Sequence, residues 1–137
     1  MSLIFTDVEE AGVWAATKCA DGGMERLRII GQCVGLQSEA HDAAKLQLVL
    51  RNLRELSCNN YLGELKVAVG ETCYEKCIGG KRLLEGSICD MMCCTLNGVI
   101  EVMDLKVWSL TDLKAFRLFW HSEAGTMWRE VSAGYTS

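Results

Sequence analysis

The most informative stretch of the chain reads ICDMMCCTLNGVIEVMDLKVW, residues 88–108. At its centre, Asn97-Gly98 is the dipeptide that a two-residue type I′ hairpin prefers, and long apolar runs flank it on both sides. We therefore expect two antiparallel strands joined by this turn. A tight turn would pair Leu96 with Val99, Cys94 with Glu101, Met92 with Met103, Asp90 with Leu105 and Ile88 with Val107 on one side of the sheet.

Both sides of this hairpin are rich in apolar residues, whereas a sheet with one wet face alternates between apolar and polar residues. Two helices can cover one face. The second face needs a cover of its own, which could be a partner subunit, the sheet curling on itself, or a bound small molecule. The residues expected at such an interface or ligand pocket are Ile100, Val102, Trp108, Trp120 and Trp128.

The rest of the chain predicts helices before the hairpin and further strands around it. A capping-box pattern at Thr6 and Glu9 predicts a helix over 7–20, and Ser38 is a good N-cap for a leucine-rich helix over 38–56. Period-two patterns and turn residues predict strands over 25–35, 64–70, 82–96, 99–110, 115–121 and 126–134.

These elements predict a single α+β domain over residues 1–137. In it, two or three N-terminal helices pack on a curved, mostly antiparallel C-terminal sheet. The order of the elements resembles that of the NTF2-like cone, in which helices fill the concave side of the sheet. An analogy of element order carries no information about function.

The composition is that of a globular chain, with 137 residues of which 50% are hydrophobic and 23% charged. Lys and Arg number seven and Asp and Glu nine in residues 1–68, and the same counts recur in residues 69–137. Because no basic stripe emerges, we expect no nucleic-acid partner. No apolar run approaches the ~20 residues of a membrane span, and the N-terminus lacks a basic and apolar leader. We therefore expect a cytoplasmic protein without a membrane partner.

The eight cysteines are expected to be thiols, because disulfide frameworks belong to short secreted chains. Cys73 and Cys77 could share a zinc ion if residues 72–77 form a helical turn. Cys89 and Cys93 could not, since residues four apart on a strand lie about 13 Å apart. Packing in the core is the favoured interpretation of the cysteines, and we expect no cofactor.

Few residues are candidates for catalysis. The histidine that a cysteine or serine nucleophile needs could only be His41 or His121, and no nucleophile signature accompanies either. Asp90 and Asp104 lie in predicted strands, where burial in a pocket would raise the carboxyl pKa and create a general base. The alternative is that these carboxylates lie at an exposed strand edge or at the mouth of a cavity.

We expect a non-catalytic interaction protein that self-associates through its apolar sheet face, as a dimer. A small apolar ligand or another protein could also bind. One alternative is a small-molecule enzyme or ligand-binding protein whose acidic pocket contains Asp90 or Asp104 with His121. The other is a regulatory module stabilised by zinc at Cys73 and Cys77.

Overall fold

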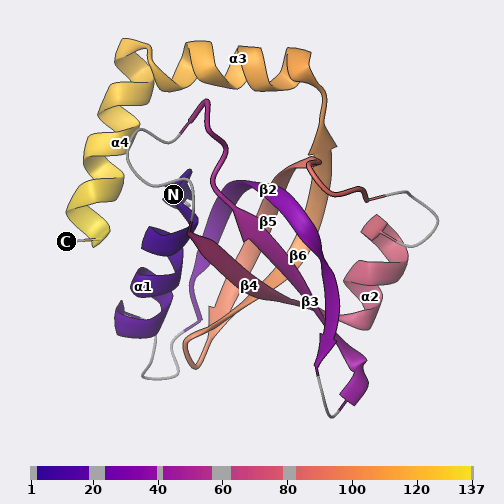
Figure 1. The fold of residues 1–137 in the computed structure, drawn as a ribbon. Coiled ribbons are helices and arrows are strands. Elements are labelled where there is room, and N and C mark those ends of the chain that lie inside the picture. The colour runs from indigo at the N-terminus through magenta and orange to yellow at the C-terminus, as the bar shows by residue number, and fades with distance from the viewer. Residues whose placement is uncertain (1–2, 19–23, 40–41, 57–62, 79–82, 137) are drawn as a thin grey trace.

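The computed structural model describes residues 3–18, 24–39, 42–56, 63–78 and 83–136 (Figure 1). In chain order these residues form β1 (Leu3–Phe5), α1 (Val8–Lys18), β2 (Arg26–Glu39), β3 (Asp42–Arg51), β4 (Glu64–Val69), α2 (Glu71–Cys73) with the π-helical turn η1 (Tyr74–Ile78), β5 (Ile88–Leu96), β6 (Val99–Trp108), α3 (Leu110–Trp120) and α4 (Glu123–Thr136). The predicted α+β class is confirmed.

The sheet curls on itself and closes into a barrel. Its six described strands follow the order β1-β2-β3-β4-β6-β5, and a further pairing joins β5 back to β2. The long strand β2 makes this closure possible, because residues 26–32 pair with β5 and residues 32–39 pair with β3. Strands β2 to β6 thus form the ring, and β1 adds to β2 in parallel. Of the three covers considered for the second sheet face, the fold provides the curled sheet.

The interior of the barrel is the main hydrophobic core. The helix α1 packs against β2, β4 and β6, and its apolar side joins the interior residues, with α2 and η1 contributing further side chains. Fully buried members of this core include Val8, Ala11, Leu27, Ile29, Leu48, Leu50, Val67 and Met91.

A second, smaller cluster lies outside the ring, under the C-terminal helices. One side of α3 presents Leu113, Phe116 and Trp120 to apolar residues from the barrel wall. These wall residues are Ile30, Leu53, Leu56 and Ile88, with Ile4, Trp108 and Trp128 packed at the margin. Figure 1 shows α3 running along one end of the barrel and α4 turning down beside it.

The predicted helix over 38–56 is wrong, because this segment contains the end of β2 and all of β3. The apolar residues of this segment fit both the helical period of about 3.6 and the strand period of about 2. Leu46, Val49 and Leu50 would lie on one side of a helix, while Leu46, Leu48 and Leu50 alternate as on a strand. Pairing of β3 with β2 and β4 on its two sides decides between them. Long-range pairing here overrides local helix propensity.

The predicted strands over 115–121 and 126–134 are also wrong, since both segments are helical in α3 and α4. The NTF2-like arrangement fails with them, because one helix precedes the barrel and two follow it. The predicted helix over 7–20 and the strands over 25–35, 64–70, 82–96 and 99–110 correspond to α1, β2, β4, β5 and β6. Within the described ranges, no helix is long and apolar enough to cross a membrane.

Candidate protein-interaction surfaces

The helix α3 carries a second apolar side that faces away from the barrel. It begins with a capping box, in which the Asp112 N–H donates to the Ser109 hydroxyl and the Ser109 N–H donates to the Asp112 carboxylate. Leu110 and Leu118 are 74% and 77% exposed, more than any other large hydrophobic residue that the structure describes. We call Leu110, Thr111, Ala115 and Leu118 the outer side of α3. Helical spacing places Thr111, Ala115 and Leu118 roughly opposite the buried residues and Leu110 on the flank of the helix, with Lys114 between Leu110 and Leu118.

Further exposed apolar residues lie on α3 and α4. Phe119 lies next to the outer side and is partly exposed, and Met127 of α4 is largely exposed. The two helices meet at Ser122, whose hydroxyl oxygen accepts from the Gly125 N–H at 3.2 Å. Single exposed apolar residues are ordinary, but a helix with apolar side chains on two opposite sides indicates a second packing partner.

The outward face of the β5–β6 hairpin is a further candidate. Near the turn, Leu96 pairs with Val99 and Cys94 with Glu101, as the sequence predicts. A bulge between Met92 and Cys93 then shifts the register, so that Met92 faces Asp104 and Asp90 faces Lys106. The predicted pairs Met92–Met103, Asp90–Leu105 and Ile88–Val107 are therefore wrong. The bulge gives Asp90 a cation opposite it in place of a leucine, which is the favourable cross-strand pair.

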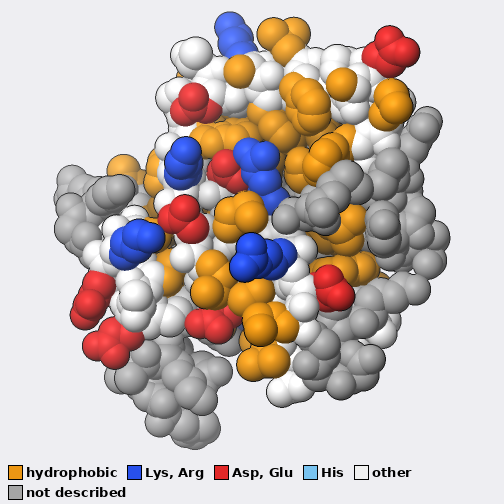
Figure 2. Space-filling view, turned by 180° about the vertical axis from the view of Figure 1, so that it is seen from behind, with side chains coloured by type: hydrophobic (Ala, Val, Ile, Leu, Met, Phe, Trp, Pro, Cys, Tyr) orange, Lys and Arg blue, Asp and Glu red, His pale blue; other side chains and the backbone are white. Residues whose placement is uncertain are grey.

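Charged and apolar side chains alternate over this outward face (Figure 2). Asp90 forms a bidentate ion pair with Arg28 of β2, at 2.7 Å to Nε and 2.9 Å to Nη2. The same guanidinium lies 5.8 Å from the ring centre of Trp108 and 5.9 Å from that of Phe116. Arg28 therefore links the hairpin to the packing under α3.

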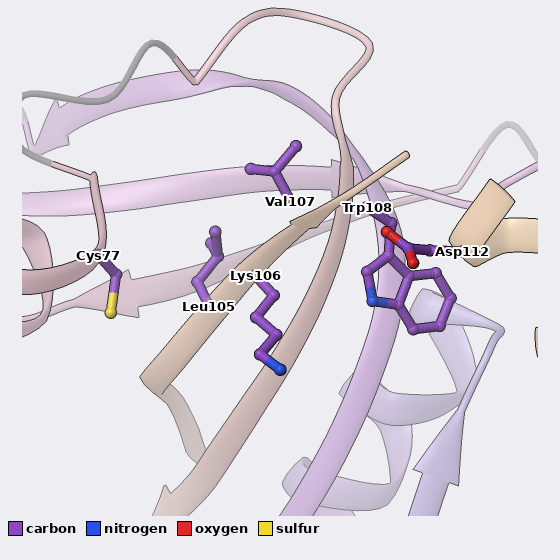
Figure 3. A pocket seen from close by; sticks show the side chains of 6 residues that line it. All are labelled: Cys77, Leu105, Lys106, Val107, Trp108 and Asp112. Atoms are coloured by element: carbon purple, nitrogen blue, oxygen red, sulfur yellow. The ribbon is translucent and has the colours of Figure 1, made fainter. Parts of the chain in front are cut away.

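A pocket of about 430 Å³ lies beside the C-terminal half of β6 (Figure 3). Its walls come from η1, β6 and the first turn of α3, through Cys77, Leu105, Lys106, Val107, Trp108 and Asp112. A smaller pocket of about 230 Å³ lies on the outward face and shares Lys106 with the first; Arg28, Asp90, Met92 and Asp104 complete its lining.

The residues predicted for an interface or ligand pocket lie in the two cores. Ile100 and Val102 point into the barrel and are buried. Trp120 is buried in the cluster under α3, with Trp108 and Trp128 at its margin. Trp108 also lines the larger pocket. A role of these five residues in binding stays a prediction.

The candidate catalytic residues are only partly brought together. Asp90 and Asp104 line the same small pocket. The Oδ1 atom of Asp104 accepts from the Leu105 N–H at 3.0 Å and from the Cys77 thiol at 3.3 Å. His121 lies elsewhere, exposed at the C-cap of α3, and His41 is outside the described residues. The enzyme alternative therefore stays a prediction without a completed acid–base arrangement.

The conditional helical turn at Cys73 and Cys77 is present, since α2 and η1 contain one cysteine each. Both thiols are buried. Burial raises the pKa of Cys73 to about 11, and the neighbouring thiol of Cys77 adds to the effect. In the described part of the chain, no group of three or more His, Cys, Asp and Glu side chains is placed to hold a metal ion. The described residues therefore place no third ligand beside Cys73 and Cys77 for the zinc ion of that alternative.

Comparison with known proteins finds similarity among the solved structures. No protein-family model matches the sequence, and no characterised protein matches it either. Among solved structures, the chain is similar to a chain of the crystal structure of yeast Stn1 and Ten1, at 29% sequence identity and a TM-score of 0.68. The match covers 86% of this chain and 87% of that one.

The expectation that nucleic acid is not a partner is wrong. The ring β2-β3-β4-β6-β5 is that of a five-stranded OB-like barrel, an architecture that binds oligonucleotides. The match to the structure of Stn1 and Ten1 extends over 86% of the chain. The argument from charge fails because a single strand can be held in a local groove of the barrel, without a basic stripe over the whole chain.

The outer side of α3 is the surface that sequence reasoning missed. The signal was present: Ser109 and Asp112 have the spacing of a capping box, and Leu113, Phe116 and Trp120 follow at helical spacing. Aromatic residues in this segment favoured a strand instead.

Proposed function

We propose that this chain is a non-catalytic subunit that binds a second OB-like protein through the outer side of α3. The observation that carries the proposal is that Leu110 and Leu118 are 74% and 77% exposed on a helix whose other side is packed against the barrel. The similarity to a structure that contains two proteins, Stn1 and Ten1, supports a heteromeric partner. Burying each leucine would contribute about 2 kcal/mol.

The test is co-expression of the chain with yeast Stn1 and, separately, with yeast Ten1, followed by size-exclusion chromatography with light scattering. We expect a 1:1 complex with one of them. Leu110→Gln with Leu118→Gln should weaken this complex at least about tenfold. The matched control is Leu96→Gln with Val99→Gln, which removes two exposed apolar residues from the hairpin.

Three outcomes would overturn this assignment of the surface. The chain could remain alone with both proteins, the hairpin variant could lose binding while the α3 variant keeps it, or the chain could form a dimer without a partner. The second outcome would move the partner interface to the hairpin, and the third would restore the self-association through the sheet face that the sequence predicts. The cytoplasmic location predicted from the sequence stays a prediction.

We also propose that single-stranded nucleic acid contacts the outward face of β3 and β4, a position favoured by the barrel topology. In OB-like barrels, the second and third strands of the ring form the binding face, and here these are β3 and β4. Lys66 is an exposed cation on β4, opposite Val49 of β3.

Fluorescence anisotropy with a labelled single-stranded DNA tests this proposal. Lys66→Glu should weaken binding and reduce the salt dependence by about one phosphate contact. Lys114→Glu, which makes the same charge change on α3, should have a smaller effect. Equal losses in both variants, equal affinity for duplex DNA, or no binding at low salt would contradict a single-strand site on this face.

A further inference from the structure

Among the residues that the structure describes, one edge of the strand β6 is paired only near its start. Along its other edge β5 pairs from Val99 to Trp108. On the edge toward β4, the register contains only Ala68 with Glu101 and Val69 with Val102. Over the described residues, no strand pairs with residues 104–108 on this side. A free strand edge offers unpaired backbone N–H and C=O groups to an incoming chain.

The hydrogen bonds of Asp104 show which way the backbone groups point. The Leu105 N–H donates to the Asp104 carboxylate at 3.0 Å, so it points away from β5 and toward the open edge. Backbone groups two residues apart on a strand point the same way, so those of Val107 face the open edge as well. The Asp104 carboxylate covers this edge, as charged side chains commonly do in natural sheets.

The larger pocket lies directly against this edge. Its lining includes all four residues from Leu105 to Trp108, together with Cys77 and Asp112 (Figure 3). The volume of about 430 Å³ accommodates a leucine or phenylalanine side chain. A strand added along β6 would send alternate side chains toward this pocket.

We propose that the free edge of β6, residues 104–108, binds an extended segment of a partner protein as an added strand. An apolar side chain of that segment enters the pocket beside Val107, and a backbone carbonyl of the segment replaces the Asp104 carboxylate at the Leu105 N–H. The displaced Asp104 carboxylate loses its Leu105 donor and so favours a basic residue next to the apolar one, while Lys106 in the same pocket offsets part of this charge. This site is separate from the outer side of α3 and does not depend on the proposed function.

The probe is an acetylated and amidated peptide of alternating lysine and valine, seven residues long, titrated into ¹⁵N-labelled protein. We expect the amide signals of Leu105 and Val107 to shift and their hydrogen exchange to slow. The same peptide with N-methylated internal amides should bind at least about tenfold more weakly, because it cannot pair with a strand edge. An alternating glutamate and valine peptide should also bind more weakly.

Two valines of β6 provide matched variants. Val107 lines the pocket and Val99 lies at the turn, and they are 51% and 57% exposed. Val107→Asp should weaken peptide binding about tenfold and Val99→Asp less than about twofold, with both folds checked by circular dichroism. Leu110→Gln with Leu118→Gln should leave peptide binding unchanged, which separates this site from the proposed function.

The proposal is overturned if the methylated peptide binds as well as the parent. It is also overturned if neither peptide binds at millimolar concentration, or if the shifted amides lie away from residues 104–108. Because the peptide comparison uses the wild-type protein, it decides the question even if Val107→Asp does not fold.

Discussion

Asn52 shows how a single buried amide joins two parts of the fold. Its side chain is 2% exposed, and its Oδ1 atom accepts from the Val8 N–H at 2.6 Å. Val8 is the first residue of α1, where backbone N–H groups have no partner within the helix. The amide that follows β3 therefore satisfies a donor at the start of α1.

We expect Asn52→Ala to lower the free energy of unfolding by about 1–3 kcal/mol, because the buried Val8 N–H would lose its acceptor. Urea unfolding followed by circular dichroism measures the change. Gln47→Ala, a control on the same stretch of chain with a partly exposed side chain, should cost less than about 1 kcal/mol. Equal losses in the two variants would show that the amide has no special role.

The buried thiols should react slowly. Burial raises the pKa of Cys89 to about 12, with smaller contributions from the Cys33 thiol and the Asp90 carboxylate. Burial also raises the pKa of Cys93. Alkylation requires the thiolate, so at pH 8 a rise from the ordinary value to about 12 reduces the reactive fraction of Cys89 about a thousandfold.

We therefore expect iodoacetamide to modify the half-buried Cys94 well before Cys89 or Cys93 in the folded protein. Peptide mapping by mass spectrometry over a time course measures the three rates. In urea the rates should become similar, which is the control for intrinsic reactivity. Comparable rates in the native state would contradict the burial of Cys89 and Cys93.

At the scale of elements, the β5–β6 hairpin was the most predictable part of the chain. Asn97 and Gly98 have φ values of 52° and 80°, the left-handed conformations that the type I′ turn requires. Pattern alone could not locate the bulge at Met92 and Cys93, because apolar residues occur on both sides of the two strands. The shifted register places Asp90 opposite Lys106 of β6 and beside Arg28 of β2. These neighbours are known only after the strands have been paired.

The capping box of α3 gives a prediction at the same scale. Ser109→Ala should lower stability by about 1 kcal/mol, because the Asp112 N–H loses its acceptor. Hydrogen bonds from the backbone and side chain of Ser109 hold the pKa of Asp112 below its ordinary value. The contribution of this carboxylate is therefore present at neutral pH and is lost as the pH falls through the lowered pKa.

Thermal unfolding of the two proteins between neutral and acidic pH provides the measurement. The difference between wild type and Ser109→Ala should shrink at the acid end. Thr111→Ala, in the same turn of α3, is the control and should stay within about 0.5 kcal/mol of wild type at every pH. A constant difference for Ser109→Ala across the range would contradict the role of Asp112 in the cap.

At the scale of the whole molecule, the sequence predicted the class and several elements, and it left a curled sheet as one of three alternatives. Residues 46–50 satisfy helical and strand periods equally, and only the neighbours β2 and β4 decide between them. Because α3 was not predicted, nothing in the expected fold covered the apolar residues of the barrel wall around Ile30. This uncovered apolar area therefore favoured the prediction of a dimer. The proposed nucleic-acid face could not be predicted from the sequence because no local motif marks it.

The helix α3 should unfold together with the barrel. Phe116 is buried against the barrel wall, whereas Leu118 on the same helix is exposed. Phe116→Ala should cost about 3 kcal/mol and Leu118→Ala less than about 0.5 kcal/mol. Tryptophan fluorescence and far-ultraviolet circular dichroism should report one coincident transition in both variants; separate transitions would show that α3 and α4 form an independent unit.

The closure of the ring through β2 has a kinetic consequence. Arg28 and Asp90 meet across that seam although 62 positions separate them in the sequence, so the entropy of closing a long loop must be overcome before the last ladder forms. Folding should therefore be slow for a chain of this size. During synthesis, the leucines that face the barrel interior therefore stay exposed to solvent until the ribosome has released β5 and β6.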